Sequence, residues 1–284
     1  MLFKKSLLTL ALAVAAMVCA SPVLQRRTLG GGISDFKCKP TAAHPYPVVL
    51  LHGLGGNALE WSYMAGRLAL EGYCTFPLNY GFVPKIPMLG GLDDMKKSGQ
   101  AVAEFVDQVL AATGAPKVDI VGHSEGSLLM RGYLKFNGGR AKTHSVAGIG
   151  SVAYGSNVQG MIDFAYKHGL VDPLTKIVRP LCKACIQVVV QSDYIAELNA
   201  GGDAFPDINY LMITSKTDEL VTPYTNGFLR TTGPNIHNVA TQDLCPFDHQ
   251  GHISQATDPI IYNAIATFFK TDDIQGVDCK SLVQ

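Results

Sequence analysis

Short apolar runs alternate with longer segments of helical periodicity along most of this chain. Continuous apolar runs, typical of buried strands, occur at residues 47–52, 73–79, 117–121, 144–149 and 208–214. Apolar residues recurring every three or four positions predict helices at residues 60–71, 93–112, 125–136 and 259–270. Because the strands are apolar throughout, both faces of their sheet should be covered. The pattern predicts a mainly parallel sheet flanked by helices.

The first 20 residues have a different character. Lys4 and Lys5 precede an apolar run at residues 7–18, and Val18-Cys19-Ala20 offers small residues for cleavage by a signal peptidase. The run is too short for a membrane-spanning helix and is typical of a secretory signal peptide. We therefore expect residues 1–20 to be a signal peptide and the mature protein to be secreted, with no stable membrane span.

The Arg26–Arg27 pair is a candidate dibasic processing site, which would make residues 21–27 a propeptide. No repeat or linker interrupts the sequence beyond it, so residues 28–284 are expected to form one domain. The chain is 47% hydrophobic and 16% charged, as in globular proteins, and its formal net charge is zero. A balanced charge provides no long-range attraction for nucleic acid or an anionic membrane.

Six of the seven cysteines lie beyond the predicted signal peptide. An even number in a secreted chain indicates disulfides. Closeness along the chain favours the pairs Cys38–Cys74, Cys182–Cys185 and Cys245–Cys279. The C-x-x-C motif at residues 182–185 is also compatible with half a zinc site or a redox pair, but no second half of a zinc site accompanies it.

The sequence G-H-S-E-G at residues 122–126 lies between a predicted strand and a predicted helix. In that context the motif is typical of a sharp turn that exposes a nucleophilic serine, here Ser124. Glycines two residues before and after the serine relieve crowding at the turn. An ordinary strand-to-helix turn is the alternative interpretation.

A serine nucleophile needs a base, and the base needs a carboxylate that orients it. In such folds the three residues occur along the chain in the order serine, acid, histidine. Asp218 follows the strand at 208–214, where a loop leaves the carboxyl edge of the sheet, and its neighbour Glu219 is a rival. Weaker candidates are Asp193, in a predicted helix, and Asp243, in a predicted strand.

Three histidines follow Asp218 in the sequence. His237 precedes a strand-like run, whereas His249 and His252 share the loop before the final helix, where the base is expected. Hydrolysis also requires donors for the oxyanion, and two backbone N–H groups suffice. The candidates are the N–H of Glu125, directly after the serine, and of Leu54 in the turn H-G-L-G-G.

Taken together, six segments make the chain resemble the class 2 lipase family of secreted α/β-hydrolases. These are P-V-V-L-L-H-G-L-G-G-N at 47–57, V-D-I-V-G-H-S-E-G at 118–126, R-G-Y-L-K-F at 131–136, L-N-A-G-G-D at 198–203, T-D-E-L-V-T-P-Y at 217–224 and L-C-P-F-D-H-Q-G-H at 244–252. The resemblance implies an α/β-hydrolase fold and a triad of Ser124, Asp218 and His252, with His252 preferred to His249. Glu125 departs from the glutamine frequent in the family, and we expect its carboxylate to turn outward, away from the oxyanion.

The resemblance implies a secreted triacylglycerol lipase or esterase that hydrolyses carboxylic esters through an acyl-enzyme. The expected substrate is a small-molecule or lipid ester at a lipid–water interface. This mechanism requires no metal or organic cofactor. Alternatives are a short-chain carboxylesterase, a cutinase-like polyester hydrolase, a serine peptidase and a non-catalytic binding relative. An insertion at residues 151–180 is predicted to form a cap or lid. Its apolar residues suit either the acyl site or the core: Met161, Ile162, Phe164, Ala165 and Leu170.

Overall fold

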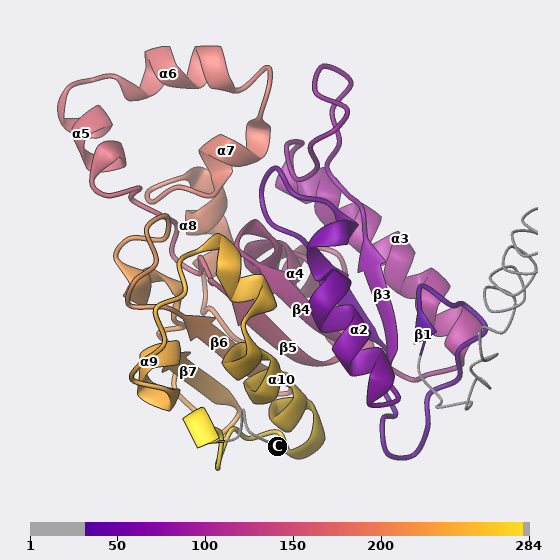
Figure 1. Cartoon of the computed structure of the whole chain (residues 1–284). Helices are drawn as coiled ribbons and strands as arrows, with labels where there is room; N and C mark the ends of the chain where they lie inside the picture. Colours follow the sequence, from indigo (N-terminus) through magenta and orange to yellow (C-terminus); the bar gives the residue numbers. More distant parts are fainter. Residues whose placement is uncertain (1–31, 281–284) are drawn as a thin grey trace, which may run out of the picture.

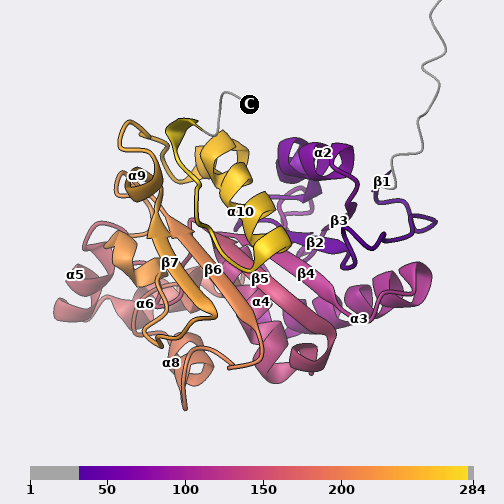
Figure 2. The ribbon, with the colours of Figure 1, turned by 90° about the horizontal axis from the view of Figure 1, so that it is seen from below.

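The computed structural model describes residues 32–280. Within this range seven parallel strands form one sheet, in the spatial order β1-β3-β2-β4-β5-β6-β7 (Figures 1 and 2). The strands are β1 Gly32–Ile33, β2 Val48–Leu51, β3 Cys74–Leu78, β4 Val118–His123, β5 Thr143–Ile149, β6 Asn209–Thr214 and β7 Ile236–Ala240. The predicted parallel α/β architecture is confirmed.

Each central strand contributes side chains to two separate hydrophobic cores. In β2, Val49 and Leu51 belong to one core, whereas Val48 and Leu50 belong to the other, and all four are fully buried. Successive side chains of a strand point to opposite faces, so burial on both faces requires an apolar residue at every position. This explains the continuous apolar runs in the sequence.

Helices cover both faces of the sheet. α3 Met95–Thr113 and α4 Glu125–Phe136 pack on one core, and α2 Ser62–Leu70 and α10 Pro259–Thr271 pack on the other. The four predicted helices are therefore present, although a short 3-10 turn, η1 Ala58–Trp61, replaces the start expected for α2. The other short helices outside the β5–β6 insertion are η2 Gly139–Lys142, η3 Tyr224–Gly227, α9 Thr241–Leu244 and η4 Ile253–Thr257.

The chain reverses direction across the sheet beside β2. It passes from β2 to β3 on one side and then crosses to β4 on the other. In open parallel sheets, a ligand site lies at such a switch point, outside the carboxyl ends of the strands. The segments that follow β2 and β4 are the glycine-rich turn at residues 53–56 and the turn that carries Ser124. The fold thus places both predicted motifs at one location.

The insertion between β5 and β6 is helical well beyond residue 180. It contains α5 Met161–Lys167, α6 Val171–Val178, α7 Lys183–Gln187 and α8 Asp193–Asn199 (Figure 1). Met161, Phe164 and Leu170 are exposed. The interpretation that these residues complete the core is therefore wrong.

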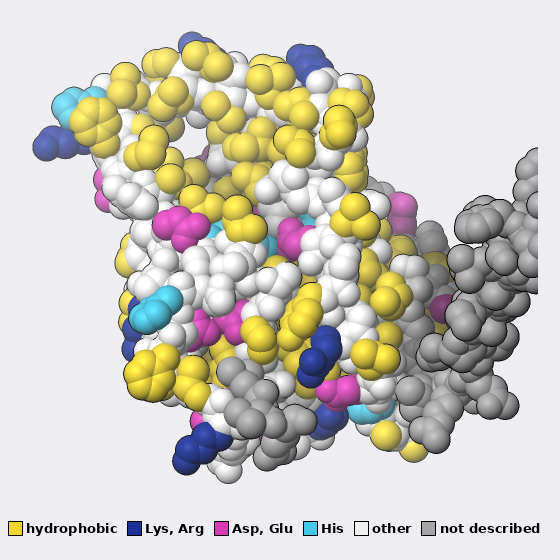
Figure 3. Space-filling model, viewed as in Figure 1, with side chains coloured by type: hydrophobic (Ala, Val, Ile, Leu, Met, Phe, Trp, Pro, Cys, Tyr) yellow, Lys and Arg dark blue, Asp and Glu magenta, His cyan; other side chains and the backbone are white. Residues whose placement is uncertain are grey.

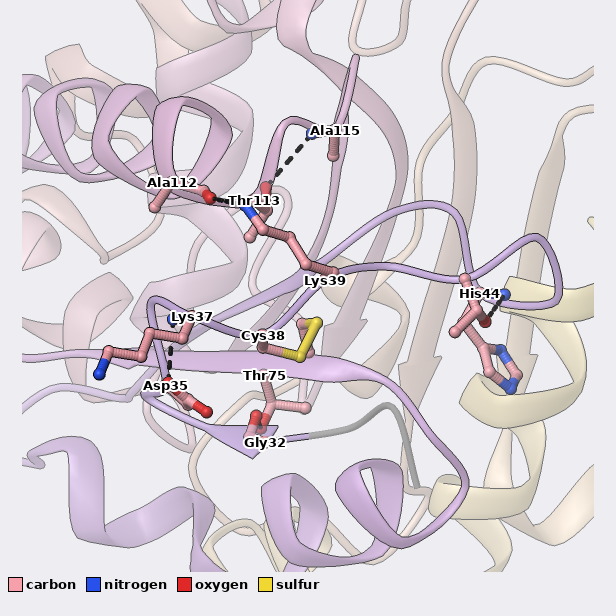
Figure 4. The surroundings of a disulfide bond; sticks show 12 residues. Gly32, Asp35, Lys37, Cys38, Lys39, His44, Thr75, Ala112, Thr113 and Ala115 are labelled. Atoms are coloured by element: carbon pink, nitrogen blue, oxygen red, sulfur yellow. Dashed lines mark hydrogen bonds between the residues drawn. A yellow bond between two sulfur atoms is a disulfide. The ribbon is translucent and has the colours of Figure 1, made fainter. Parts of the chain in front are cut away.

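Three disulfides join the described cysteines in the predicted pairs, Cys38–Cys74, Cys182–Cys185 and Cys245–Cys279. The first fastens the segment after β1 to the start of β3, and Lys39 from the same segment donates a hydrogen bond to the carbonyl of Ala112 at the end of α3 (Figure 4). The C-x-x-C motif forms a disulfide at the start of α7, between the N-cap residue Cys182 and Cys185 inside the helix.

Removing the long-range and the short-range bridges should have unequal effects on stability. Cys245 and Cys279 are 34 residues apart, whereas Cys182 and Cys185 are 3 apart. The loss of chain entropy on closing the longer loop corresponds to about 3–4 kcal/mol, and on closing the shorter loop to about 1–2 kcal/mol. Thermal denaturation of the two double cysteine-to-alanine variants should show the larger loss of Tm for the Cys245–Cys279 pair. Equal losses would contradict this expectation.

The predicted signal peptide and the Arg26–Arg27 processing site lie outside the described residues. No helix between residues 32 and 280 is both long enough and apolar enough to cross a membrane.

Candidate active site

Ser124 lies in a strained turn directly after β4. Its φ and ψ are 54° and −119°, a backbone conformation rare for residues other than glycine, and it is the N-cap of α4. If Gly122 carried a side chain, its Cβ would lie 2.3 Å from the carbonyl oxygen of Gly126. A Cβ added at Gly126 would lie 2.2 Å from the carbonyl oxygen of Leu51. Both glycines are therefore required by close backbone packing, and the turn presents the hydroxyl at the carboxyl edge of the sheet.

The side chains of Ser124, His252 and Asp218 form a continuous hydrogen-bonded chain. His252 Nε2 lies 2.8 Å from Ser124 Oγ, and His252 Nδ1 lies 2.7 Å from Asp218 Oδ2. His252 and Asp218 are buried, and Ser124 is partly exposed. A hydroxyl, an imidazole and a carboxylate in this order are suited to activating the hydroxyl as a nucleophile.

Asp218 is held as a carboxylate by four donors. Its Oδ1 accepts from the backbone N–H groups of Leu220 and Val221, and its Oδ2 accepts from Gln255 as well as His252. Burial acts to raise the pKa of Asp218, but hydrogen bonding and charge from His252, together with the Val221 and Gln255 donors, outweigh burial and lower it. The carboxylate can therefore orient the His252 ring and stabilise its protonated form.

The rival candidates do not join the side-chain hydrogen bonds that link Ser124, His252 and Asp218. His249 is exposed, and Glu219 contacts His252 only through the backbone, where its Oε2 accepts from the His252 N–H at 3.0 Å. Asp243 lies in α9, not in a strand as predicted, and pairs with Lys216. His237 lies within β7 rather than before it.

Asp193 begins α8, as expected for a helical residue, and is exposed. It takes no part in the hydrogen-bonded chain that joins Ser124, His252 and Asp218.

A second chain of polar contacts, which the sequence did not reveal, reaches the backbone of His252. His123 Nε2 lies 3.0 Å from the backbone carbonyl oxygen of His252, and His123 Nδ1 lies 2.8 Å from Glu60 Oε1. The other carboxylate oxygen of Glu60 accepts from the N–H of Gly53 at 3.3 Å. One carboxylate thus connects the loop of His252 with the turn after β2.

The glycine-rich turn after β2 borders Ser124. A Cβ at Gly53 would lie 3.3 Å from the Ser124 Cβ, so Leu54 follows a residue that packs against the serine. Glu125 is the first residue of α4, where N–H groups have no partner inside the helix. Both predicted oxyanion donors therefore belong to segments that adjoin Ser124.

Glu125 does not turn outward, and that expectation is wrong. The residue is 1% exposed, and neither carboxyl oxygen has a hydrogen-bond partner in the described part of the chain. A Cβ at Gly91 would lie 2.4 Å from Glu125 Oε2, so the carboxyl packs against the backbone beside the glycine-rich turn. Burial, and then the charge of Glu60, raise the pKa of Glu125 well above its ordinary value. A protonated carboxyl explains how the residue is accommodated without burying a charge beside the glycine-rich turn.

Glu125→Gln should stabilise the protein more at alkaline than at acidic pH. In the unfolded chain a glutamate ionises near pH 4.3, about its ordinary pKa, whereas the folded chain retains the proton. The folded state therefore binds more protons, and the free energy of unfolding falls as the pH rises above that range. Thermal denaturation should show a larger gain in Tm for the variant at pH 8 than at pH 5. An equal difference at both pH values would mean that Glu125 is ionised in the folded protein.

Within residues 32–280 no group of three or more histidine, cysteine, aspartate or glutamate side chains is arranged to hold a metal ion.

Comparison with known families gives a match over most of the described chain. A family model described as Lipase (class 2) matches residues 45–261. The chain is 37% identical over 97 residues to a triacylglycerol lipase of Pseudarthrobacter phenanthrenivorans, an alignment that covers 32% of this chain and 28% of the relative. It is 25% identical over 174 residues to a triacylglycerol lipase of Vibrio cholerae, covering 61% and 51%. The chain thus spans from about a quarter to half of the length of these relatives.

Solved structures share the fold at low sequence identity. Lipase B of Aspergillus fumigatus superposes with a TM-score of 0.65 at 17% identity, covering 86% of this chain and 58% of that one. The mature lipase BlEst2 of Bacillus licheniformis superposes with a TM-score of 0.58 at 19% identity, covering 85% and 96%. These likenesses concern the fold alone.

Proposed function

The chain belongs to the class 2 lipase family, and from this premise we propose that it is a secreted serine esterase or lipase that hydrolyses the carboxylic ester bonds of acylglycerols. Ser124 is the nucleophile, His252 the general base and acid, and Asp218 the carboxylate that orients and stabilises His252. The observation that carries this proposal is the pair of short distances at His252, 2.8 Å to the serine oxygen and 2.7 Å to the aspartate oxygen.

The reaction proceeds in two halves. Ser124 Oγ attacks the ester carbonyl carbon while its proton passes to His252 Nε2, and the N–H groups of Leu54 and Glu125 hold the tetrahedral oxyanion. When the intermediate collapses, His252 protonates the departing alcohol, leaving an acyl group on the serine. Water then attacks the acyl-enzyme with His252 as base, which releases the acid and restores the serine.

The second polar chain gives two further residues a positioning role. Glu60 contacts both the N–H of Gly53 and the ring of His123, and His123 contacts the backbone of His252. Burial acts to raise the pKa of Glu60, but the hydrogen bond and charge of His123 and the Gly53 N–H outweigh it and lower the pKa. An ionised Glu60 thereby fixes the separation between the oxyanion turn and the base.

Secretion is supported by the three disulfides, which persist in oxidising compartments. The basic and then apolar start of the sequence agrees with export.

Covalent labelling tests the proposal directly. A fluorophosphonate probe reacts with an activated serine, so digestion and peptide mapping should recover the adduct on Ser124 alone. The labelled protein should lose its turnover of p-nitrophenyl esters in proportion to the adduct formed. Labelling of another serine, or no labelling of a folded protein, would refute the proposal.

A further inference from the structure

Two neighbouring loops carry the acid and the base of the proposed triad. Asp218 lies in the loop after β6, and His252 ends the loop between α9 and η4. Three consecutive residues of the first loop each contact the second. The Thr217 hydroxyl donates to the carbonyl of Gln250 at 3.1 Å, and Asp218 Oδ2 lies 2.7 Å from the ring of His252. Glu219 Oε2 accepts from the N–H of His252 at 3.0 Å.

The backbone of His252 is held at both of its polar groups. Its N–H donates to Glu219, and its carbonyl oxygen lies 3.0 Å from Nε2 of His123, at the end of β4. The position of the imidazole follows from the position of this backbone. A displacement of a reacting group by about 1 Å can cost on the order of 10²-fold in rate. The 2.8 Å distance from His252 Nε2 to Ser124 Oγ therefore depends on both contacts.

The glycine before His252 leaves space for the carboxylate of Glu219. A Cβ added at Gly251 would lie 2.6 Å from Glu219 Oε2 and 3.3 Å from its Cδ. The φ of Gly251 is not positive, so its backbone conformation is open to other residues. The space for the carboxylate, rather than the conformation of the chain, accounts for a glycine here.

The carboxylate of Glu219 can be displaced without disturbing a core. The residue is exposed, and together with Gly251 it lines an open hollow of about 530 Å³, which Glu60 and Ile253 also border. Figure 3 shows acidic and histidine side chains at the surface below α5 and α6. A carboxylate that loses its place beside the His252 N–H can therefore turn toward solvent.

We propose that Glu219 is a positioning residue, whose carboxylate holds the backbone of His252 where the imidazole reaches both Ser124 and Asp218. This inference rests on the function proposed above, in which His252 is the general base. Glu219 transfers no proton, because it contacts the backbone and not the ring. Two successive carboxylates of one loop thus serve one histidine: Asp218 orients its ring, and Glu219 locates its backbone.

Three variants separate the hydrogen bond from the charge and from the side chain itself. Glu219→Ala removes the acceptor, whereas Glu219→Gln keeps an oxygen that can accept the same N–H. Gly251→Ala leaves the glutamate in place but puts a methyl group where the carboxylate lies. The matched control, Glu104→Ala, removes an exposed glutamate from α3. kcat and KM are measured for p-nitrophenyl acetate, with circular dichroism to verify folding.

We expect Glu219→Ala to lower kcat about tenfold and to leave KM within about twofold, since it shifts the base and not the substrate. Glu219→Gln should keep kcat within about threefold of the unmodified protein, because the amide oxygen replaces the acceptor. Gly251→Ala should lose about as much as Glu219→Ala. The double variant should lose no more than either single one, because both changes break the same contact. Glu104→Ala should change nothing.

Four results would overturn the inference and leave the proposed function standing. These are an unchanged kcat in Glu219→Ala or Gly251→Ala, equal losses in Glu219→Gln and Glu219→Ala, a change confined to KM, and losses that multiply in the double variant. If Glu219→Ala does not fold, Glu219→Gln and Gly251→Ala still decide: retained kcat in the first and lost kcat in the second support the inference, and any other result overturns it. Absence of acetate turnover in the unmodified protein would instead refute the proposed function.

Discussion

Ser124→Ala is expected to lower kcat for p-nitrophenyl butyrate by about 10⁴-fold or more, because no other hydroxyl replaces the one that His252 activates. The remaining rate would come from substrate binding and the oxyanion donors alone. Stopped assays at high enzyme concentration can quantify so slow a turnover.

The protein should remain folded in this variant. The Ser124 side chain is partly exposed, and it makes no side-chain hydrogen bond that caps α4. An unchanged Tm is therefore the control that separates lost chemistry from lost structure. If a folded Ser124→Ala protein turned over the ester at nearly the unmodified rate, Ser124 would not be the nucleophile, and the proposed function would be refuted.

His252→Ala should reduce kcat by about 10⁴-fold as well, whereas His249→Ala should change it by no more than about twofold. The ring of His252 bridges the serine and the aspartate, while His249 is exposed three residues before it. The two variants remove the same kind of side chain from the same loop, so they form a matched pair.

Steady-state kinetics of both histidine variants, with circular dichroism to verify folding, measures this difference. A larger loss in His249→Ala than in His252→Ala would mean that the loop adopts another arrangement during turnover, with His249 as the base.

The elements that pack the sheet could be predicted from the sequence because each carries a strong local signal. The run at β2 is apolar at every position, and α10 begins with Asp258 and Pro259, residues typical of a helix start. The sequence also placed Ser124, Asp218 and His252 at one edge of the sheet, since parallel strands share their carboxyl ends. The structure brings these three side chains within hydrogen-bonding distance, and their catalytic roles remain a prediction.

The supporting residues could not be predicted, because their signals arise only in three dimensions. Glu60 lies at the start of a helical segment and His123 inside the serine motif, and nothing in the sequence links positions 63 residues apart. The direction of Glu125 depends on the space between α4 and Gly91. In the insertion, α6 contains no buried residue, yet its helical periodicity does not differ from that of a helix that packs on a core.

The carboxyl edge of the sheet carries the proposed catalytic residues, and the last described residues lie at the opposite end of the molecule from α5 and α6 (Figure 1). A tether attached at Lys280 would therefore fix the protein to a solid support with its catalytic opening directed into the surrounding liquid. Immobilised in that orientation, the protein would stay open to emulsified oil droplets, because no part of the support would stand between them and the serine.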